Sequence, residues 1–182
     1  MVSVDSLVAG IDPGVRGGLV ALRLGDGKIM AFFPFTKSRY KTWWQQKEAF
    51  QEIAFLVKYV FLERIPIQPA DSRDGNISIA KLNAHYGFWQ GVVMTCGFFD
   101  ERTLFRVTPP VWQGKMKCLT GGNKRVTLNK AKKLFRDDPF AGMITHATAD
   151  AALIAEYGRR KIAHRLEADL ISIAISDKFG DL

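Results

Sequence analysis

SLVAGIDPGVRGGLVALRLGDGKIMAFFPF, residues 6–35, is the stretch that decides the fold. Its first seven residues, 6–12, form a short apolar run that ends in an acid, which is typical of a buried strand. The glycine-rich PGVRGG that follows favours a turn. Apolar runs at residues 19–24 and 28–35 are separated by GDG, a strong hairpin signal. The stretch therefore predicts three strands in an antiparallel meander.

Beyond this meander, helices and strands alternate. Residues 42–60 have helical spacing, with one apolar side made of Trp44, Phe50, Ile53, Ala54 and Val57. An apolar run that again ends in an acid, 59–63, predicts the fourth strand, and 103–109 predicts the fifth. Between them we expect a polar loop at 68–76 and a long, largely buried helix at 77–99. After the fifth strand we expect a short helix at 109–117, a flexible loop at 119–123, an amphipathic helix at 125–135, a helix carrying His146, and a last helix or its continuation at 161–175.

Crossover helices between the later strands imply parallel pairing and helices on both faces of the sheet. The predicted fold is α/β, with a mixed five-stranded sheet. The length of 182 residues suits one domain, and neither a repeat nor a linker interrupts it, so we predict a single domain over residues 1–182.

The sequence lacks a long apolar run and the layout of a signal peptide, so we expect a cytoplasmic protein without a membrane partner. The two cysteines, Cys96 and Cys118, lack metal-ligand spacing and are expected to be free thiols.

The net charge is +8 and the isoelectric point is about 9.6, which fits a nucleic-acid partner as well as a merely soluble basic protein. The distribution favours the first explanation, because residues 115–136 contain eight basic residues and no acid. These are Lys115, Lys117, Lys124, Arg125, Lys130, Lys132, Lys133 and Arg136. Binding through such a segment should weaken as salt rises.

Two strands end in carboxylates, Asp12 and Glu63. Sites gather where parallel strands end, so these acids converge if the first and fourth strands are neighbours. Farther along, His146 and Asp150 are four residues apart, which would place them on one helix face. Such a set suits Mg²⁺ or Mn²⁺, and two ions about 3.5–4 Å apart can promote phosphodiester hydrolysis.

Each of these residues also has a local explanation. Asp12 precedes Pro13 and Gly14, as acids in turns do. Glu63 could be a surface acid paired with Arg64, and His146 and Asp150 could be solvated residues of a helix capped by Thr145.

Three segments, IDPGVRGGLVAL (11–22), FLERIP (61–66) and HATADAALIAEYG (146–158), resemble the RuvC-like Holliday-junction resolvases, most of all their phage and chloroplast branch. The resemblance extends roughly from Ser6 to Arg160. It implies a ribonuclease-H-like fold, with metal ligands at Asp12, Glu63 and Asp150. Many relatives carry a further acid at the position of Ala147; a subset resembles this chain in having a histidine at the position of His146, which we interpret as a fourth active-site residue, a metal ligand or a group that orients water.

The same resemblance predicts DNA-binding lysines at Lys115, or Lys117, and at Lys124, and we add Arg125 and Lys130 from the basic segment. Apolar residues after the fourth strand, Ile65 and Ile67, are candidate wedges between bases. Relatives dimerise along the long helix, where Phe88 and Trp89 serve either the interface or the core. We interpret Trp43 and Trp44 as core or surface packing.

The predicted protein is a homodimeric, Mg²⁺- or Mn²⁺-dependent endonuclease that resolves four-way DNA junctions by paired symmetric nicks, in the cytoplasm of a cell or of a phage-infected host. The alternatives are a ribonuclease-H-like nuclease that cuts RNA in hybrids and a non-catalytic junction-binding protein. IDPGVRGG also resembles the phosphate loop of actin-like kinases, but those enzymes need two such domains, for which this chain is too short.

Overall fold

The computed structural model describes residues 5–64, 73–121 and 123–179. Five strands form one mixed sheet in the order β3-β2-β1-β4-β5. The strands are β1 (Leu7–Asp12), β2 (Gly18–Arg23), β3 (Ile29–Pro34), β4 (Val57–Glu63) and β5 (Leu104–Val107). The first three form the antiparallel meander that the sequence predicts, and β1–β4 and β4–β5 pair in parallel. The predicted α/β class and the mixed five-stranded sheet are thereby confirmed.

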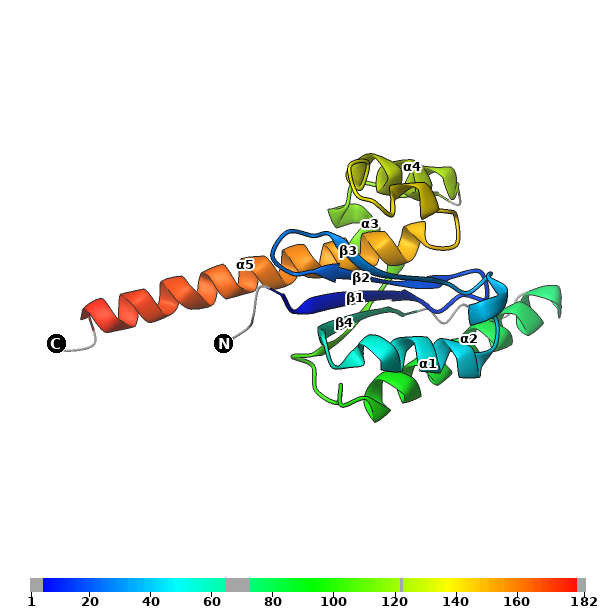
Figure 1. Ribbon diagram of the computed structural model, residues 1–182, viewed down its shortest axis with the longest axis horizontal. Coiled ribbons are helices and arrows are strands. Elements are labelled where there is room, and N and C mark those ends of the chain that lie inside the picture. Colours follow the sequence, from blue (N-terminus) through cyan, green and yellow to red (C-terminus); the bar gives the residue numbers. More distant parts are fainter. Residues whose placement is uncertain (1–4, 65–72, 122, 180–182) are drawn as a thin grey trace.

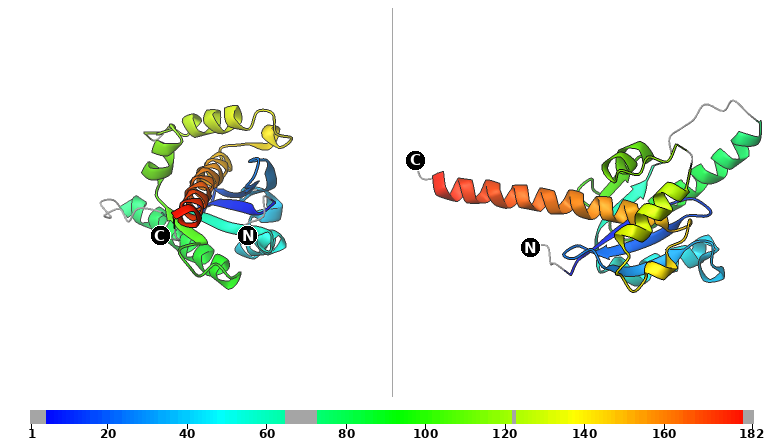
Figure 2. Two further views of the ribbon diagram at one scale, coloured as in Figure 1. Left: turned by 90° about the vertical axis from the view of Figure 1, so that its left-hand side faces the viewer. Right: turned by 90° about the horizontal axis from the view of Figure 1, so that it is seen from above.

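Helices cover both faces of the sheet (Figure 1). One face is covered by α3 (Pro109–Lys115), α4 (Arg125–Leu134) and α5 (Ala149–Phe179), and the other by α1 (Trp43–Ala54) and α2 (Arg73–Thr95). Short 3₁₀ turns, η1 (Ser38–Tyr40) and η2 (Ala141–Met143), follow β3 and precede α5. The C-terminal part of α5 projects beyond the sheet (Figure 2). Among the described residues, none of the helices is both long and apolar enough for a bilayer crossing.

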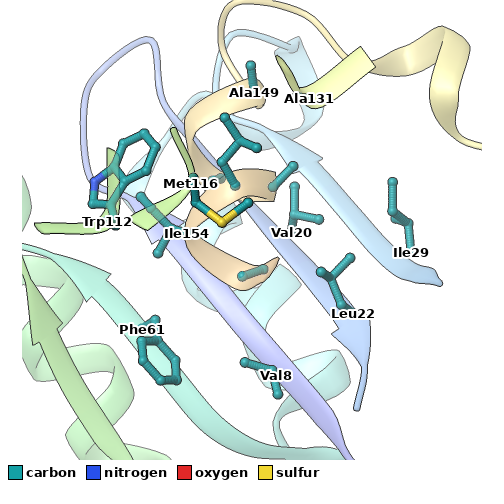
Figure 3. Close-up of a cluster of buried hydrophobic side chains, with 14 of the residues drawn as sticks. Val8, Val20, Leu22, Ile29, Phe61, Trp112, Met116, Ala131, Ala149 and Ile154 are labelled. Atoms are coloured by element: carbon teal, nitrogen blue, oxygen red, sulfur yellow. The ribbon is translucent and has the colours of Figure 1, made fainter. Parts of the chain in front are cut away.

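Alternation along the strands divides the core into two layers. Leu7, Ala9 and Ile11 of β1 pack toward α1 and α2, whereas Val8 packs toward α5. Figure 3 shows Val8 with Val20, Leu22, Phe61 and Ile154 on the α5 side. Asp12 comes two residues after Gly10 and four after Val8, so it lies on the same face of the sheet, the one that α5 covers.

A glycine lets α5 lie directly against β1. A Cβ atom built on Gly10 would overlap the backbone of Ala151 and Ala155, closer than real Cβ atoms approach such atoms. Glycine in a strand commonly marks such a close backbone approach. The contact fixes the first turns of α5 over the C-terminal half of β1.

Several details differ from the sequence prediction. The helical spacing that seemed to run to residue 60 ends at Ala54, because Val57 already belongs to β4. Trp44 does not lie on the buried side of α1 but is 64% exposed. Residues 73–76, predicted as loop, belong to α2, and α2 is not largely buried, because only one side of it packs on the sheet.

Other expectations find a clear answer. Of the two candidate interface residues, Trp89 is fully buried in the core and Phe88 packs against it. Cys96 and Cys118 are free thiols, as predicted.

Candidate functional site

Asp12 is held at the end of β1 by the turn that follows it. The backbone N–H of Gly14 donates a hydrogen bond to Oδ1 of Asp12 at 2.9 Å. A Cβ atom on Gly17 would overlap the Asp12 carbonyl, so the turn closes tightly around the acid. The local explanation of Asp12 as a turn residue is thus correct in part. The side chain is nevertheless only 9% exposed, which a turn residue alone would not require.

Glu63 ends the neighbouring strand on the same face of the sheet. Ile11 of β1 pairs with Leu62 of β4, so Asp12 and Glu63 follow at the same level. The indole Nε1 of Trp112, in α3, donates a hydrogen bond to Glu63 Oε1 at 2.8 Å. Glu63 is therefore a half-buried acid with a buried partner, rather than a surface acid paired with Arg64.

Asp150 lies in the first turn of α5, at the helix end where backbone N–H groups favour a negative charge. Its Oδ1 is buried and has no hydrogen-bond partner among the described residues. Burial raises the pKa of Asp150, and the Thr127 hydroxyl, Lys124 and His146 oppose that rise. A buried carboxylate oxygen without a partner is costly unless a cation or a proton satisfies it.

The structure brings these three acids to one cavity. Asp12, Glu63 and Asp150 line a space of about 390 Å³ together with Lys124, Arg16 and the turn after β1. We call this space the acid cavity. It lies where β1 and β4 end and α5 begins, at the edge of the sheet that Figure 1 shows opposite the N-terminus.

Burial and mutual repulsion make the acids hard to ionise. The pKa of Asp12 rises from 3.8 to about 6, first through burial and then through Asp150, while Gly14 and Lys124 lower it. The pKa of Glu63 rises from 4.5 to about 8, first through burial and then through Asp12, with Trp112 and Lys124 opposing. Such strongly raised carboxyl pKa values in a cleft are typical of functional sites.

The donor set fits a hard divalent cation, because carboxylate oxygens are the ligands that Mg²⁺ and Mn²⁺ prefer and one of these oxygens is buried without a partner. The side chains themselves, however, stand farther apart than ligands of one metal ion do. Within residues 5–64, 73–121 and 123–179, no three His, Cys, Asp or Glu side chains are grouped closely enough to hold one metal ion as they stand.

The expected position of His146 is wrong. Residues 146–148 form a turn and α5 begins at Ala149, so His146 and Asp150 do not share a helix face. The turn is closed by Thr145, whose hydroxyl accepts from the Ala147 N–H and whose carbonyl accepts from the N–H of Thr148. His146 is exposed and lines a neighbouring cavity, although it is close enough to help lower the pKa of Asp150.

The predicted DNA-binding residues are dispersed. Lys124 precedes α4 and lines the acid cavity, whereas Lys115 lines a separate cavity with Tyr157 and Lys161. Lys117 and Arg125 are exposed, with Lys117 at a positive φ of 54°, and Lys130 is half-buried in α4. Ile65 and Ile67 lie outside the described residues.

Two residues at the site have no assigned role in the sequence prediction. Arg16 lines the acid cavity from the turn after β1, and the only sequence signal was a lone cation among the glycines of PGVRGG. Trp112 contacts Glu63 across the chain, and nothing in PPVWQGK indicates that its indole reaches an acid 49 positions away.

No family model and no curated protein matches the sequence. Among solved structures, the chain is similar to T. thermophilus RuvC in complex with a Holliday junction substrate, with a TM-score of 0.52, 18% identity, and 84% of this chain and 91% of that chain covered. It is also similar to the Thermus thermophilus RuvC structure, with a TM-score of 0.48, 19% identity, and 83% and 92% covered. The first likeness shows that the chain has the RuvC-like, ribonuclease-H-like fold.

Proposed function

We propose that this protein is an endonuclease that resolves four-way DNA junctions. The observation that carries the proposal is the acid cavity: three carboxylates from segments far apart in the sequence line one space with Lys124. The RuvC-like fold supports it, and the similar RuvC structure is a complex with a Holliday junction substrate. The net charge of +8 suits a DNA substrate.

In this proposal Asp12, Glu63 and Asp150 hold divalent metal, Mg²⁺ or Mn²⁺, with two ions per site. When bound, such ions activate a water and stabilise the leaving oxygen in phosphodiester hydrolysis. The raised pKa values of Asp12 and Glu63 support this role, since burial and, second, repulsion between the acids raise them, and a bound cation offsets both. Binding would draw the three carboxylates closer together than they stand.

The surrounding residues have separate tasks. Trp112 holds the Glu63 carboxylate through its indole N–H, and the Gly14 N–H holds that of Asp12. Lys124 offers a positive charge to the phosphate at the rim of the cavity. His146, which lines the neighbouring cavity, would act as a fourth metal ligand or orient the attacking water. Lys115, Lys117, Arg125 and Lys130 would bind the DNA backbone farther from the acid cavity.

We further propose that the protein acts as a homodimer, with one acid cavity per subunit. A four-way junction needs two matching cuts in opposed strands, and a two-fold axis supplies two equivalent sites.

The test compares three substrates with purified protein and Mg²⁺: a synthetic four-way junction, a linear duplex of the same sequence and an RNA/DNA hybrid. We expect paired nicks in the junction and little cutting of the other two. Asp150→Asn should abolish cutting, whereas the exposed Asp26→Asn, as a matched control, should not. Equal cutting of duplex and junction, preferential cutting of the hybrid, or no cutting by folded protein would overturn the proposal.

A further inference from the structure

A second, larger cavity adjoins the acid cavity. Its volume is about 820 Å³, and it lies between the end of β3 and the loop that leads into α5. Phe32, Pro34, Thr36 and Lys37 line it from one side, and the other side consists of Gly142, Met143, Thr145, His146 and Ala147. We call this space the side groove.

The side groove is basic. Its described lining includes four basic residues and no acidic one. The basic residues are Arg16, Lys37, Lys124 and His146. Arg16 and Lys37 are exposed, and in the part of the chain that the structure describes neither forms an ion pair. Their charges are therefore free to meet an anion from solution. An arginine fork and a lysine point charge both suit phosphate oxygens.

The side groove adjoins the acid cavity. Arg16 and Lys124 line both spaces, so an extended ligand that spans the two would meet both cations. Apolar side chains, Phe32 and Met143 among them, complete the lining. A groove lined by both cations and apolar side chains suits a sugar–phosphate chain, whose phosphates are charged and whose sugars present carbon atoms.

We propose that the side groove holds the cleaved DNA strand where it leaves the acid cavity, with Arg16 and Lys37 on the phosphate next to the one that is cut. This inference rests on the proposed function, because the acid cavity must be where the strand is cut. It assigns to Arg16 and Lys37 a role that no sequence motif indicated, and it places the strand on the β3 side of the cavity.

The first experiment measures junction binding in EDTA over a series of salt concentrations. Lys37→Gln should weaken binding and lower the slope of log affinity against log salt by about one, the value for one lost phosphate contact. Lys58→Gln, an exposed lysine at the opposite end of β4, is the matched control and should leave affinity and slope unchanged. Lys37 is exposed, so the substitution should leave the melting temperature unchanged. Measuring thermal unfolding of the variant checks that it is folded.

The second experiment locates the contact. Single phosphates around the cut are replaced by uncharged methylphosphonates, and each junction is tested with wild type and Lys37→Gln. At the phosphate beside the cut, the two changes together should cost no more affinity than either alone. Full additivity at every position, or an unchanged salt slope, would overturn the inference.

The outcomes separate the inference from the function. If Lys37→Gln lowers the salt slope while wild type cuts no junction, the groove binds DNA and the proposed function fails. If wild type cuts junctions and Lys37→Gln binds them as wild type does, the proposed function stands and the groove is not used.

Discussion

Asparagine at position 12 separates the charge of Asp12 from its place in the turn. The amide oxygen of Asn can still accept the Gly14 N–H that now lies 2.9 Å from Oδ1, but the side chain cannot ionise. In the wild type, burial and Asp150 raise the pKa of Asp12 from 3.8 to about 6. At about 1.4 kcal/mol per pKa unit, ionising Asp12 costs the folded protein on the order of 3 kcal/mol.

The sign of the pH dependence follows from linkage. Because the folded state holds this proton more tightly than the unfolded state, the cost is absent below pH 3.8 and complete above about pH 6. Without metal, the wild type should therefore lose stability as pH rises through this window, whereas Asp12→Asn should not lose the same amount. At about pH 8 the variant should melt some 6–12 °C higher, since 1 kcal/mol shifts the melting temperature of a chain of this length by about 2–4 °C.

The assay is thermal unfolding in EDTA from about pH 8 down to about pH 4, where the advantage of the variant should vanish. Asp26→Asn is the matched control, because Asp26 also accepts a backbone N–H two residues on, from Lys28, but is exposed. The Asp26 pKa is lowered, first by that hydrogen bond, so its loss should stabilise nothing at pH 8. If Asp12→Asn melts at or below the wild type at pH 8, burial and repulsion do not penalise the charge of Asp12, and the reasoning fails. In a separate measurement, added Mg²⁺ should stabilise the wild type more than the variant.

Three further predictions concern the same site. Gly10→Ala should destabilise the protein by about 1–3 kcal/mol or more in urea unfolding, because the new Cβ atom meets the backbone of α5. The control, Gly87→Ala, has open space around it and should stabilise α2 by up to about 1 kcal/mol. Trp112→Phe removes the indole N–H that lowers the Glu63 pKa, so the acidic limb of the cleavage–pH profile should move to higher pH; an unmoved limb would show that Glu63 does not set it. Lys124→Gln should lower both the cleavage rate and junction affinity, because Lys124 lines the acid cavity. Lys115→Gln should lower affinity alone, because Lys115 lines a separate cavity. Equal effects of the two variants in single-turnover kinetics would contradict the role given to Lys124 at the acid cavity.

The sheet could be predicted because its signals are local. Each strand is a short apolar run with a turn at its end, and the GDG between β2 and β3 fixes the hairpin. The crossover helix α1 predicts parallel pairing for β4 but does not choose its neighbour, and the structure shows that this neighbour is β1. Once β1 and β4 are known to be neighbours, Asp12 and Glu63 must end side by side, because each is the last residue of its strand.

The start of α5 could not be predicted in the same way. Four-residue spacing between His146 and Asp150 suits a helix, but residues 146–148 form a turn whose N–H groups bond to the hydroxyl and carbonyl of Thr145, and α5 begins only at Ala149. Serine and threonine compete with helices through such local bonds, and sequence alone does not tell which side wins. The prediction that Trp44 is buried failed for another reason. The apolar spacing of α1 continues into β4, so the sequence suggested a longer helix with a different buried side.

Gly10 connects the core to the chemistry of the site. A glycine inside a strand sacrifices packing and backbone order, so its presence between Val8 and Asp12 calls for a compensating contact. That contact is the backbone of α5 at Ala151 and Ala155, one and five residues beyond Asp150. On β1, Gly10 precedes Asp12 by two residues on the same face. One close approach thus fixes the position of both acids, and the pKa of Asp12 rises first because the acid is buried and second because the carboxylate of Asp150 lies near it.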